Sequence, residues 1–174
     1  MILFASVFLF LVALSISIVG YSLHYGISPM PSPRKAREKI TALLPISEGK
    51  VYELGSGWGH LIFPLARRFP NLSLYAYEGS FVPWLVSTLL QKGLGYPNLH
   101  ITRKDFFQIS LKEADGIVCY LYPAAMRRLK KKLEEEGKPG LFVLSYAFSI
   151  PGWKAKKEVP LGDLLNSKVY LYVL

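Results

Sequence analysis

The chain has 174 residues, 51% of them hydrophobic, which is enough for one globular domain with a sizeable core. One cysteine, Cys119, excludes a disulfide framework and a cysteine-based zinc site, and the three histidines lie too far apart for metal ligands, so we expect no metal. The formal net charge of +9 is typical of proteins that bind nucleic acid, an anionic membrane surface or an acidic partner.

The N-terminal segment is apolar. Residues 2–19 carry no charge, and as a helix they would span about 27 Å, close to the thickness of a bilayer's hydrocarbon core. The alternative is a cleaved signal peptide, but no basic residue precedes the run and no clear cleavage site follows it. The first cations, at 34–39, put the rest of the chain on the cytoplasmic side. We predict a transmembrane anchor over residues 1–21, a linker over 22–32 and a folded domain over 33–174.

The domain begins with a helix signal. Ser32 and Pro33 are typical of a helix start, and apolar residues recur at helical spacing up to Pro45. One face of this helix is basic. Its cations are either solvated or lie on anionic lipid headgroups, and we favour a helix that packs on the domain with solvated cations.

Strand and helix patterns alternate from Val51 onward. The expected strands cover 51–54, 72–77, 100–102, 116–122, 141–146 and 168–174, and the expected helices cover 61–69, 82–91 and 124–136. Such alternation predicts an α/β fold with a Rossmann-like, doubly wound, mostly parallel sheet of six to seven strands. No clear helix precedes the last strand, which suits an antiparallel edge.

A glycine turn follows the first strand. Glu53 precedes Gly55, Gly57 and Gly59, and an amphipathic run comes next. Glycines are needed where the backbone takes positive φ or where a ligand must approach the main chain closely. Ligands of open α/β sheets lie beyond the carboxyl ends of the strands, so the ends of the first four strands should form the site.

The spacing of this turn limits the ligand. Dinucleotide-binding folds have G-x-G-x-x-G, whereas this chain has G-x-G-x-G after an acid. The acid would repel a pyrophosphate but suits a cation. S-adenosylmethionine carries a sulfonium and an ammonium and no phosphate, so it fits, whereas a nicotinamide-dependent oxidoreductase does not.

At these residues the sequence resembles the class I S-adenosylmethionine-dependent methyltransferases. The acid and the three glycines match the first motif of that family. The resemblance implies that Glu78 takes the ribose hydroxyls and that Asp105 and Phe106 lie near the adenine. It also implies that a motif on the fourth strand, here Asp115 through Pro123 with Tyr120 and Tyr122, faces the methyl acceptor.

Shorter motifs carry a narrower resemblance. They are Pro83 to Val86, Arg103 to Phe107, Tyr120 to Pro123, Phe148 to Trp153 and Val169 to Tyr172. They are similar to motifs of the small membrane-anchored lysine methyltransferases, which in mitochondria modify the adenine nucleotide translocase and the ATP synthase c-subunit and which have prokaryotic relatives. This resemblance implies a membrane-protein lysine as acceptor.

Several residues have two interpretations. Tyr120 and Tyr122 share a face if their strand is regular, where they either orient an amine or pack in the core. Asp105 either lies at the adenine or caps backbone amides. Asp115 is either a strand-start residue or a site residue, and 151–153 form either a lid over the acceptor or a turn.

We therefore expect a single-pass membrane methyltransferase with its domain on the cytoplasmic side, in a bacterial inner membrane or, in a eukaryote, the mitochondrial inner membrane. Its expected partners are the lipid bilayer and a membrane-protein substrate. The alternatives are a lipid or quinone acceptor and a cofactor-binding protein without catalysis. Cations and acids are mixed over 124–136 as on a solvated helix face, so nucleic acid is not an expected partner.

Overall fold

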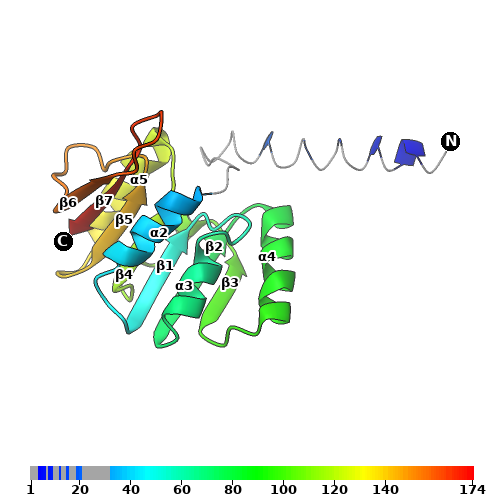
Figure 1. Ribbon diagram of the computed structural model, residues 1–174, viewed down its shortest axis with the longest axis horizontal. Helices are drawn as coiled ribbons and strands as arrows, with labels where there is room; N and C mark the ends of the chain where they lie inside the picture. Colours follow the sequence, from blue (N-terminus) through cyan, green and yellow to red (C-terminus); the bar gives the residue numbers. More distant parts are fainter. Residues whose placement is uncertain (1–3, 7, 10–11, 13–14, 16–18, 21–31) are drawn as a thin grey trace.

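The computed structural model describes residues 4–6, 8–9, 12, 15, 19–20 and 32–174 (Figure 1). Most of the predicted anchor over 1–21 and nearly all of the predicted linker over 22–32 lie outside the described residues, so both stay predictions. Within the described part of the chain, no helix is long and apolar enough to cross a membrane.

A seven-stranded sheet forms the centre of the domain. Its strands are β1 (Gly49–Leu54), β2 (Leu72–Glu78), β3 (Leu99–Arg103), β4 (Gly116–Cys119), β5 (Phe142–Tyr146), β6 (Lys157–Pro160) and β7 (Lys168–Val173). Their order is β3-β2-β1-β4-β5-β7-β6. Strands β1 to β5 are parallel, and β7 is antiparallel to both β5 and β6. The predicted Rossmann-like α/β fold with a mostly parallel sheet is confirmed.

Two details differ from the expected strands. β7 is antiparallel but is not the edge, because β6 pairs outside it. β6 has no buried residue and so leaves no hydrophobic pattern in the sequence. The strand expected over 116–122 ends at Cys119, because Pro123 begins the next helix and Tyr122 is that helix's N-cap.

The helices cover both faces of the sheet. They are α2 (Arg34–Leu43), α3 (Ile62–Arg68), α4 (Phe81–Leu94) and α5 (Pro123–Glu136), with a short 3-10 helix, η1 (Phe106–Gln108). The apolar sides of α2 and α3 pack on one face of the sheet, and α5 and the segment around η1 pack on the other. Helix α4 contacts β3 and β2 at one side of the sheet (Figure 1).

The strand order explains where a ligand can lie. The chain runs from β1 outward through β2 to β3, and then crosses back to place β4 on the other side of β1. The connections leaving β1 and β4 therefore turn in opposite directions at neighbouring carboxyl ends. In open α/β sheets the ligand crevice forms at this switch point, which here begins with the glycine turn.

Candidate cofactor and acceptor site

The glycine turn holds three backbone positions at positive φ. Gly55, Gly57 and Gly59 have φ of 78°, 54° and 82°. The N–H groups of Gly55 and Ser56 donate to the carbonyl oxygen of Tyr77 at 2.9 and 3.1 Å, so the turn is fastened to the end of β2. A Cβ at Gly59 would lie 2.4 Å from the ring of Phe63, whereas a Cβ at Gly57 would meet no atom within 4 Å. Gly59 is therefore needed for packing, and the backbone at Gly57 is accessible to a ligand.

Glu78 joins the turn to helix α4. Its side chain is buried, with Oε2 accepting from the N–H of Gly57 at 2.8 Å and Oε1 accepting from the N–H of Ser80 at 2.7 Å. The carbonyl oxygen of Glu78 accepts from the N–H of Lys104 at 3.1 Å, which brings the segment after β3 to the same place. Glu78 thus fixes three segments of the site against one another.

Glu53 is buried and incompletely paired. It is 5% exposed, and its Oε2 has no hydrogen-bond partner among the described residues. Burial, and to a lesser extent the negative charge of Glu78, raise the pKa of Glu53 well above its usual range. The hydroxyl of Ser56 is also buried without a partner in the described part of the chain. Buried polar groups are costly when unpaired, so these two atoms are suited to a polar ligand that reaches the turn.

The structure places Asp105 and Phe106 beside this turn but gives both an internal role. The carboxylate of Asp105 accepts from the N–H of Phe107 at 2.9 Å and caps η1, as the capping alternative for this residue describes. Phe106 is 2% exposed and packs in the core. Their contact with an adenine stays a prediction, and it would have to involve the loop's edge rather than the buried Phe106 ring.

Aromatic side chains gather at the carboxyl ends of β4 and β5. The ring of Tyr120 lies 4.6 Å from that of Tyr146 and 6.4 Å from that of Phe148, centroid to centroid. The ring of Tyr122 lies 6.2 Å from that of Phe148, edge to face. Tyr120 and Tyr122 lie beyond β4, so the expected shared strand face is wrong. Phe148 brings the two tyrosines into one group, which we call the aromatic wall (Tyr120, Tyr122 and Phe148).

Burial distinguishes the two tyrosines of this wall. Tyr122 is 38% exposed, whereas Tyr120 is half-buried. Burial, together with the neighbouring Tyr146, raises the pKa of Tyr120, so its hydroxyl stays protonated at neutral pH. Its hydroxyl can therefore both donate and accept a hydrogen bond.

Phe148 contacts both candidate tyrosines, a grouping that the sequence alone does not predict. It follows a strained turn in which Ala147 has φ of 65°, a left-handed conformation that costs a non-glycine residue about 1 kcal/mol. The N–H of Ala147 donates to the carbonyl oxygen of Lys168 at 2.9 Å, and the hydroxyl of Ser145 donates to the carbonyl oxygen of Phe148 at 2.5 Å. These bonds hold Phe148 in place. Its sequence signal is an aromatic residue two positions after the strand expected over 141–146.

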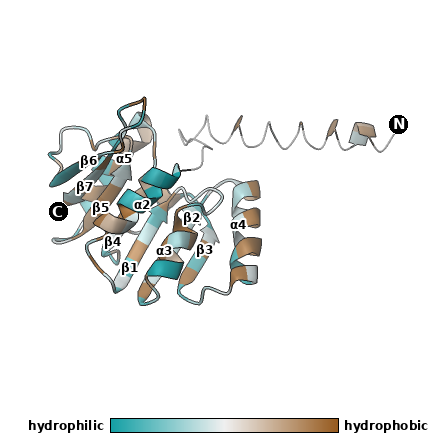
Figure 2. Ribbon diagram, in the orientation of Figure 1, coloured by the Kyte–Doolittle hydropathy of each residue, from teal (hydrophilic) through white to brown (hydrophobic). Residues whose placement is uncertain are grey.

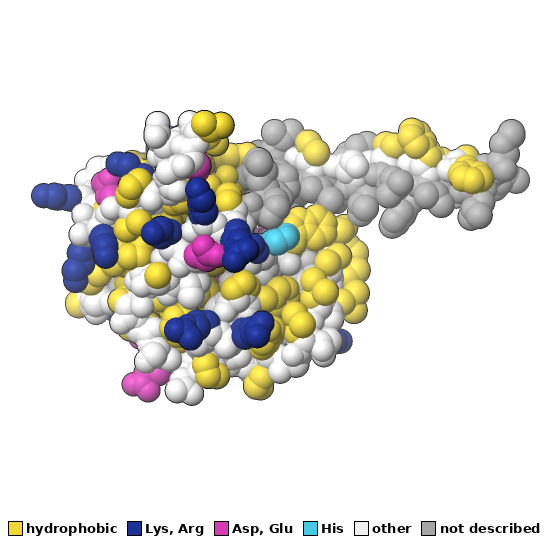
Figure 3. Space-filling view, viewed as in Figure 1, with side chains coloured by type: hydrophobic (Ala, Val, Ile, Leu, Met, Phe, Trp, Pro, Cys, Tyr) yellow, Lys and Arg dark blue, Asp and Glu magenta, His cyan; other side chains and the backbone are white. Residues whose placement is uncertain are grey.

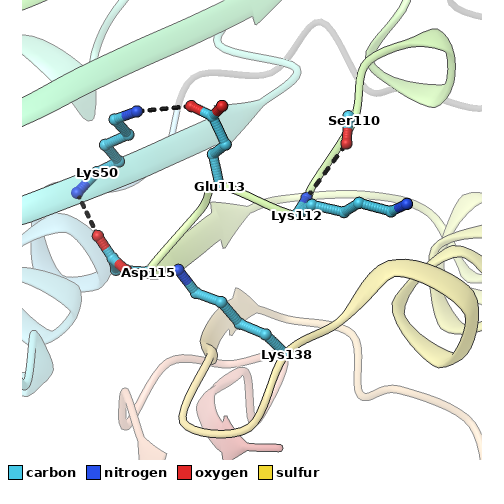
Figure 4. Close-up of polar contacts among 6 residues, drawn as sticks. All are labelled: Lys50, Ser110, Lys112, Glu113, Asp115 and Lys138. Atoms are coloured by element: carbon cyan, nitrogen blue, oxygen red, sulfur yellow. Dashed lines mark hydrogen bonds and ion pairs between the residues drawn. The ribbon is translucent and has the colours of Figure 1, made fainter.

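Asp115 lies at the opposite end of the sheet. Its Oδ2 accepts from the N–H of Lys50 at 2.8 Å, and its Oδ1 pairs with Nζ of Lys138 at 2.7 Å (Figure 4). The nearby Glu113 pairs with Nζ of Lys50 at 2.6 Å. These bonds support the interpretation of Asp115 as a strand-start residue rather than as a site residue.

The segment 151–153 forms a turn. Gly152 has φ of 76°, and the N–H of Trp153 donates to the carbonyl oxygen of Ile150 at 3.2 Å. The indole of Trp153 lies 6.2 Å from the ring of Tyr172 on β7. This packing supports the turn interpretation over the lid.

Strand order, the antiparallel β7 and an acid followed by a glycine turn after β1 define a class I S-adenosylmethionine-dependent methyltransferase. The family model described as the ANTKMT methyltransferase domain matches residues 53–157. The chain belongs to this family.

Curated relatives support the same assignment. The protein-lysine N-methyltransferase of Saccharolobus islandicus (strain REY15A) is 30% identical over 149 residues, which cover 83% of this chain and 92% of the relative. The adenine nucleotide translocase lysine N-methyltransferase of Mus musculus is 29% identical, over 78% of this chain and 58% of the relative. The ATP synthase c-subunit lysine N-methyltransferase of Homo sapiens is 26% identical, over 71% of this chain and 53% of the relative. The chain thus spans little more than half of these two mammalian proteins.

A solved structure shows the same fold. The RNA methyltransferase from Salinibacter ruber, in complex with S-adenosyl-L-homocysteine, matches this structure with a TM-score of 0.75 at 24% identity. The match covers 83% of this chain and 93% of the chain of that protein. The family match makes S-adenosylmethionine the cofactor. The site fits that cofactor, because an unpaired carboxylate suits its ammonium and an accessible glycine backbone admits it.

Proposed function

We propose that the protein transfers the methyl group of S-adenosylmethionine to the side-chain amine of a lysine in a membrane protein. The observation that carries the acceptor assignment is the aromatic wall, which stands at the carboxyl ends of β4 and β5 beside the glycine turn. Relatives named as protein-lysine N-methyltransferases support it.

The residues of the glycine turn hold the cofactor in this proposal. Glu53 pairs with the ammonium, and Gly55, Gly57 and Gly59 give it access to the backbone. Glu78 accepts from the ribose hydroxyls with the lone pairs that its two backbone bonds leave free, since an ionised carboxylate has about four acceptor positions.

Asp105 and Phe106 form the adenine side of the proposed site. The bonds of Lys104 to Glu78 and of Phe107 to Asp105 fix this loop next to the ribose position. The bound cofactor supplies an electrophilic methyl group on a cationic sulfur. The chain's own task is to place an uncharged amine in line with that group.

The aromatic wall prepares the acceptor. A free lysine has a pKa of about 10.4 and is charged at neutral pH. Tyr120, Tyr122 and Phe148 contact the methylene stem and exclude water, and this desolvation lowers the pKa of the amine. The protonated hydroxyl of Tyr120 accepts one N–H of the neutral amine and so directs its lone pair.

The membrane part of the proposal rests on the N-terminal segment. Residues 2–19 are long enough to anchor the chain, and the cations at 34–39 favour a domain on the cytoplasmic side. The two mammalian relatives are named for acting on the adenine nucleotide translocase and the ATP synthase c-subunit, which are membrane proteins. An anchored domain meets such substrates at the bilayer surface.

A labelled methyl donor tests the acceptor class. Purified full-length protein is incubated with radiolabelled S-adenosylmethionine and membranes, and protein is then separated from solvent-extractable lipid. The proposal predicts label in membrane protein. Label in the lipid fraction would instead identify a lipid or quinone acceptor, and S-adenosylhomocysteine binding without any transfer would identify a non-catalytic protein.

A further inference from the structure

Helix α4 directs two polar side chains, Ser87 and Gln91, toward the domain and leaves five large apolar side chains exposed. Ser87 is fully buried, and its hydroxyl donates to the carbonyl oxygen of Trp84 at 3.0 Å. The side-chain amide of Gln91 donates to the carbonyl oxygen of Leu99 on β3. Five large apolar side chains on α4 are between 37% and 59% exposed: Phe81, Leu85, Leu89, Leu90 and Leu94. A surface helix normally has the reverse arrangement, so this face is suited to an apolar surrounding.

The exposed residues form two rows along the helix. Phe81, Leu85 and Leu89 follow at intervals of four in one row, and Leu90 and Leu94, also four apart, form a second row about 100° further around the helix. Figure 2 shows α4 as a largely hydrophobic ribbon, and in Figure 3 hydrophobic side chains cover the side of the domain where α4 lies. An apolar face of this extent marks an interaction site.

The exposed charges in the stretch of chain that contains α4 have one sign. Between Leu54 and Lys104 the only acid is Glu78, which is buried. The cations in the same stretch are Arg67, Arg68, Lys92, Arg103 and Lys104. The guanidinium of Arg103 lies 5.2 Å from the centre of the Phe81 ring, so one cation borders the apolar face directly. An apolar face with Lys92 on its own helix and Arg103 at its border complements an anionic lipid surface.

The N-terminal end of α4 and the start of the folded domain lie at the same end of the sheet. The N-cap of α4 is Ser80, whose N–H donates to Glu78 beside the glycine turn. Near the start of α2, Nη1 of Arg37 donates to the carbonyl oxygen of His60 in that turn at 3.2 Å. The predicted linker over 22–32 separates the predicted anchor from α2, and a segment of that length reaches at most about 40 Å. An anchor in a bilayer therefore keeps α4 within reach of the same bilayer.

We propose that the exposed face of α4 docks into the interfacial layer of an anionic lipid bilayer. The two apolar rows enter the boundary between headgroups and acyl chains, and Lys92, Arg103 and the α3 arginines lie on the headgroups. Docking holds the acceptor end of the sheet beside the membrane surface, where a lysine of a membrane protein emerges. This purpose rests on the proposed function, but the docking itself is measurable without it.

Contact quenching in vesicles tests the docking. Full-length protein carrying Leu89→Cys is labelled with a thiol-reactive fluorophore, and the buried Cys119, 1% exposed, is protected from the reagent. The matched control is Lys131→Cys, an exposed position on α5, which packs on the opposite face of the sheet from α2 and α3. Both are reconstituted in vesicles of phosphatidylcholine and phosphatidylglycerol that contain a lipid with a nitroxide near its headgroup.

The proposal predicts that the label at Leu89→Cys loses about half of its fluorescence or more, while the label at Lys131→Cys changes little. Adding Leu85→Ser and Leu90→Ser should reverse most of the loss at position 89. S-adenosylhomocysteine binding by each variant shows that the domain remains folded.

Other outcomes overturn the docking. Equal quenching at both positions would mean that the anchor alone brings the domain near lipid. If the label at position 89 is shielded from solvent in the absence of lipid, another protein surface covers α4. That surface belongs to a second copy of the chain if the shielding rises with protein concentration. It is the chain's own N-terminal segment if the shielding does not change. Bound S-adenosylhomocysteine with no quenching refutes the docking alone, whereas quenching without methyl transfer to any lysine refutes the proposed function alone.

Discussion

Glu78 and Gly57 are joined by a hydrogen bond of 2.8 Å from the glycine N–H to the carboxylate Oε2. The same carboxylate accepts from Ser80 at the start of α4. One buried side chain therefore sets the distance between the glycine turn and the next helix. The proposed cofactor site depends on this distance.

Replacing Glu78 by alanine should weaken both binding and folding. The change leaves two buried N–H groups without an acceptor, which costs about 2 kcal/mol of unfolding free energy, and S-adenosylhomocysteine binding should fall below detection. Calorimetric titration and denaturant unfolding measure the two effects. Glu158→Ala, which removes an exposed carboxylate paired with Lys168 on β7, is the control and should change neither appreciably. Normal binding by Glu78→Ala would refute the proposed ribose contact.

Gly57→Ala should affect binding more than stability. A Cβ at this position meets no protein atom within 4 Å, so the folded chain pays only for the left-handed φ, about 1 kcal/mol. The methyl group would occupy the ligand side of the turn, and affinity for S-adenosylhomocysteine should fall about tenfold or more. Gly95→Ala, with φ of 68° and equal space but outside the site, should show the same stability loss and unchanged binding. Equal affinities in the two variants would contradict the site.

Glu53→Gln should stabilise the protein without cofactor while weakening cofactor binding. Because burial raises the pKa of Glu53 in the folded state, the unfolded chain loses this proton at a lower pH than the folded chain does. Stability therefore falls as pH rises from the unfolded pKa towards the folded one, and the glutamine variant escapes this loss. Thermal unfolding at pH 5 and pH 8 should show an advantage of the variant that grows with pH.

The same carboxyl group should make cofactor binding pH-dependent. The proposed pairing with an ammonium requires ionised Glu53, so wild-type affinity should rise with pH and binding should release a proton. Titrations in buffers of different ionisation enthalpy measure that proton. Glu53→Gln should bind more weakly and release none, and a variant that binds as well as wild type would remove Glu53 from the site.

Phe148→Leu should change the acceptor reaction alone. The leucine keeps apolar volume but loses the ring contacts to Tyr120 and Tyr122, so kcat/KM for the lysine substrate should fall about 10- to 100-fold. Affinity for S-adenosylhomocysteine should stay within about twofold, since Phe148 is outside the glycine turn. The control is Trp153→Phe, whose ring packs on β7 away from the wall. A parallel loss of cofactor affinity in Phe148→Leu would mean that the residue only supports the fold.

Asp115→Ala should lower stability and leave activity intact. The bonds from Lys138 and from the Lys50 N–H lower the pKa of Asp115 below its usual value of 3.8. Its contribution is therefore present above the unfolded pKa and is lost as pH falls below 3.8 through the folded pKa. Denaturant unfolding at pH 7 should show a loss of about 1–2 kcal/mol that disappears at low pH. If the folded variant no longer bound the cofactor, Asp115 would have to be a residue of the cofactor site.

Local patterns predict the central fold. β1 to β3 and the glycine turn follow one another along a short stretch of chain, so periodicity and glycine spacing indicate them, whereas the role of Glu78 came from the family resemblance and stays a prediction. β6 could not be recognised because its side chains are mostly exposed. The sequence predicts a strand up to residue 122, whereas β4 ends at Cys119, because apolar residues continue beyond Cys119 into the turn before α5.

Long-range contacts account for what the sequence could not show. Phe148 joins the tyrosines only because β7 fixes the turn at Ala147 through Lys168. The partners of Asp115 come from positions 50 and 138. The periodicity of α4 predicts a helix, but it does not say which face meets the sheet, and so the outward apolar rows appeared only in the structure.

Mapping the methylated residue tests the central claim most directly. Full-length wild type and Gly57→Ala are incubated with membranes and S-adenosylmethionine carrying an isotope-labelled methyl group, and the membrane proteins are digested and sequenced by mass spectrometry. The account predicts labelled methyl on lysine side chains with wild type and a strong reduction with the variant. Labelled methyl on another residue type, or only in extracted lipid, would contradict it.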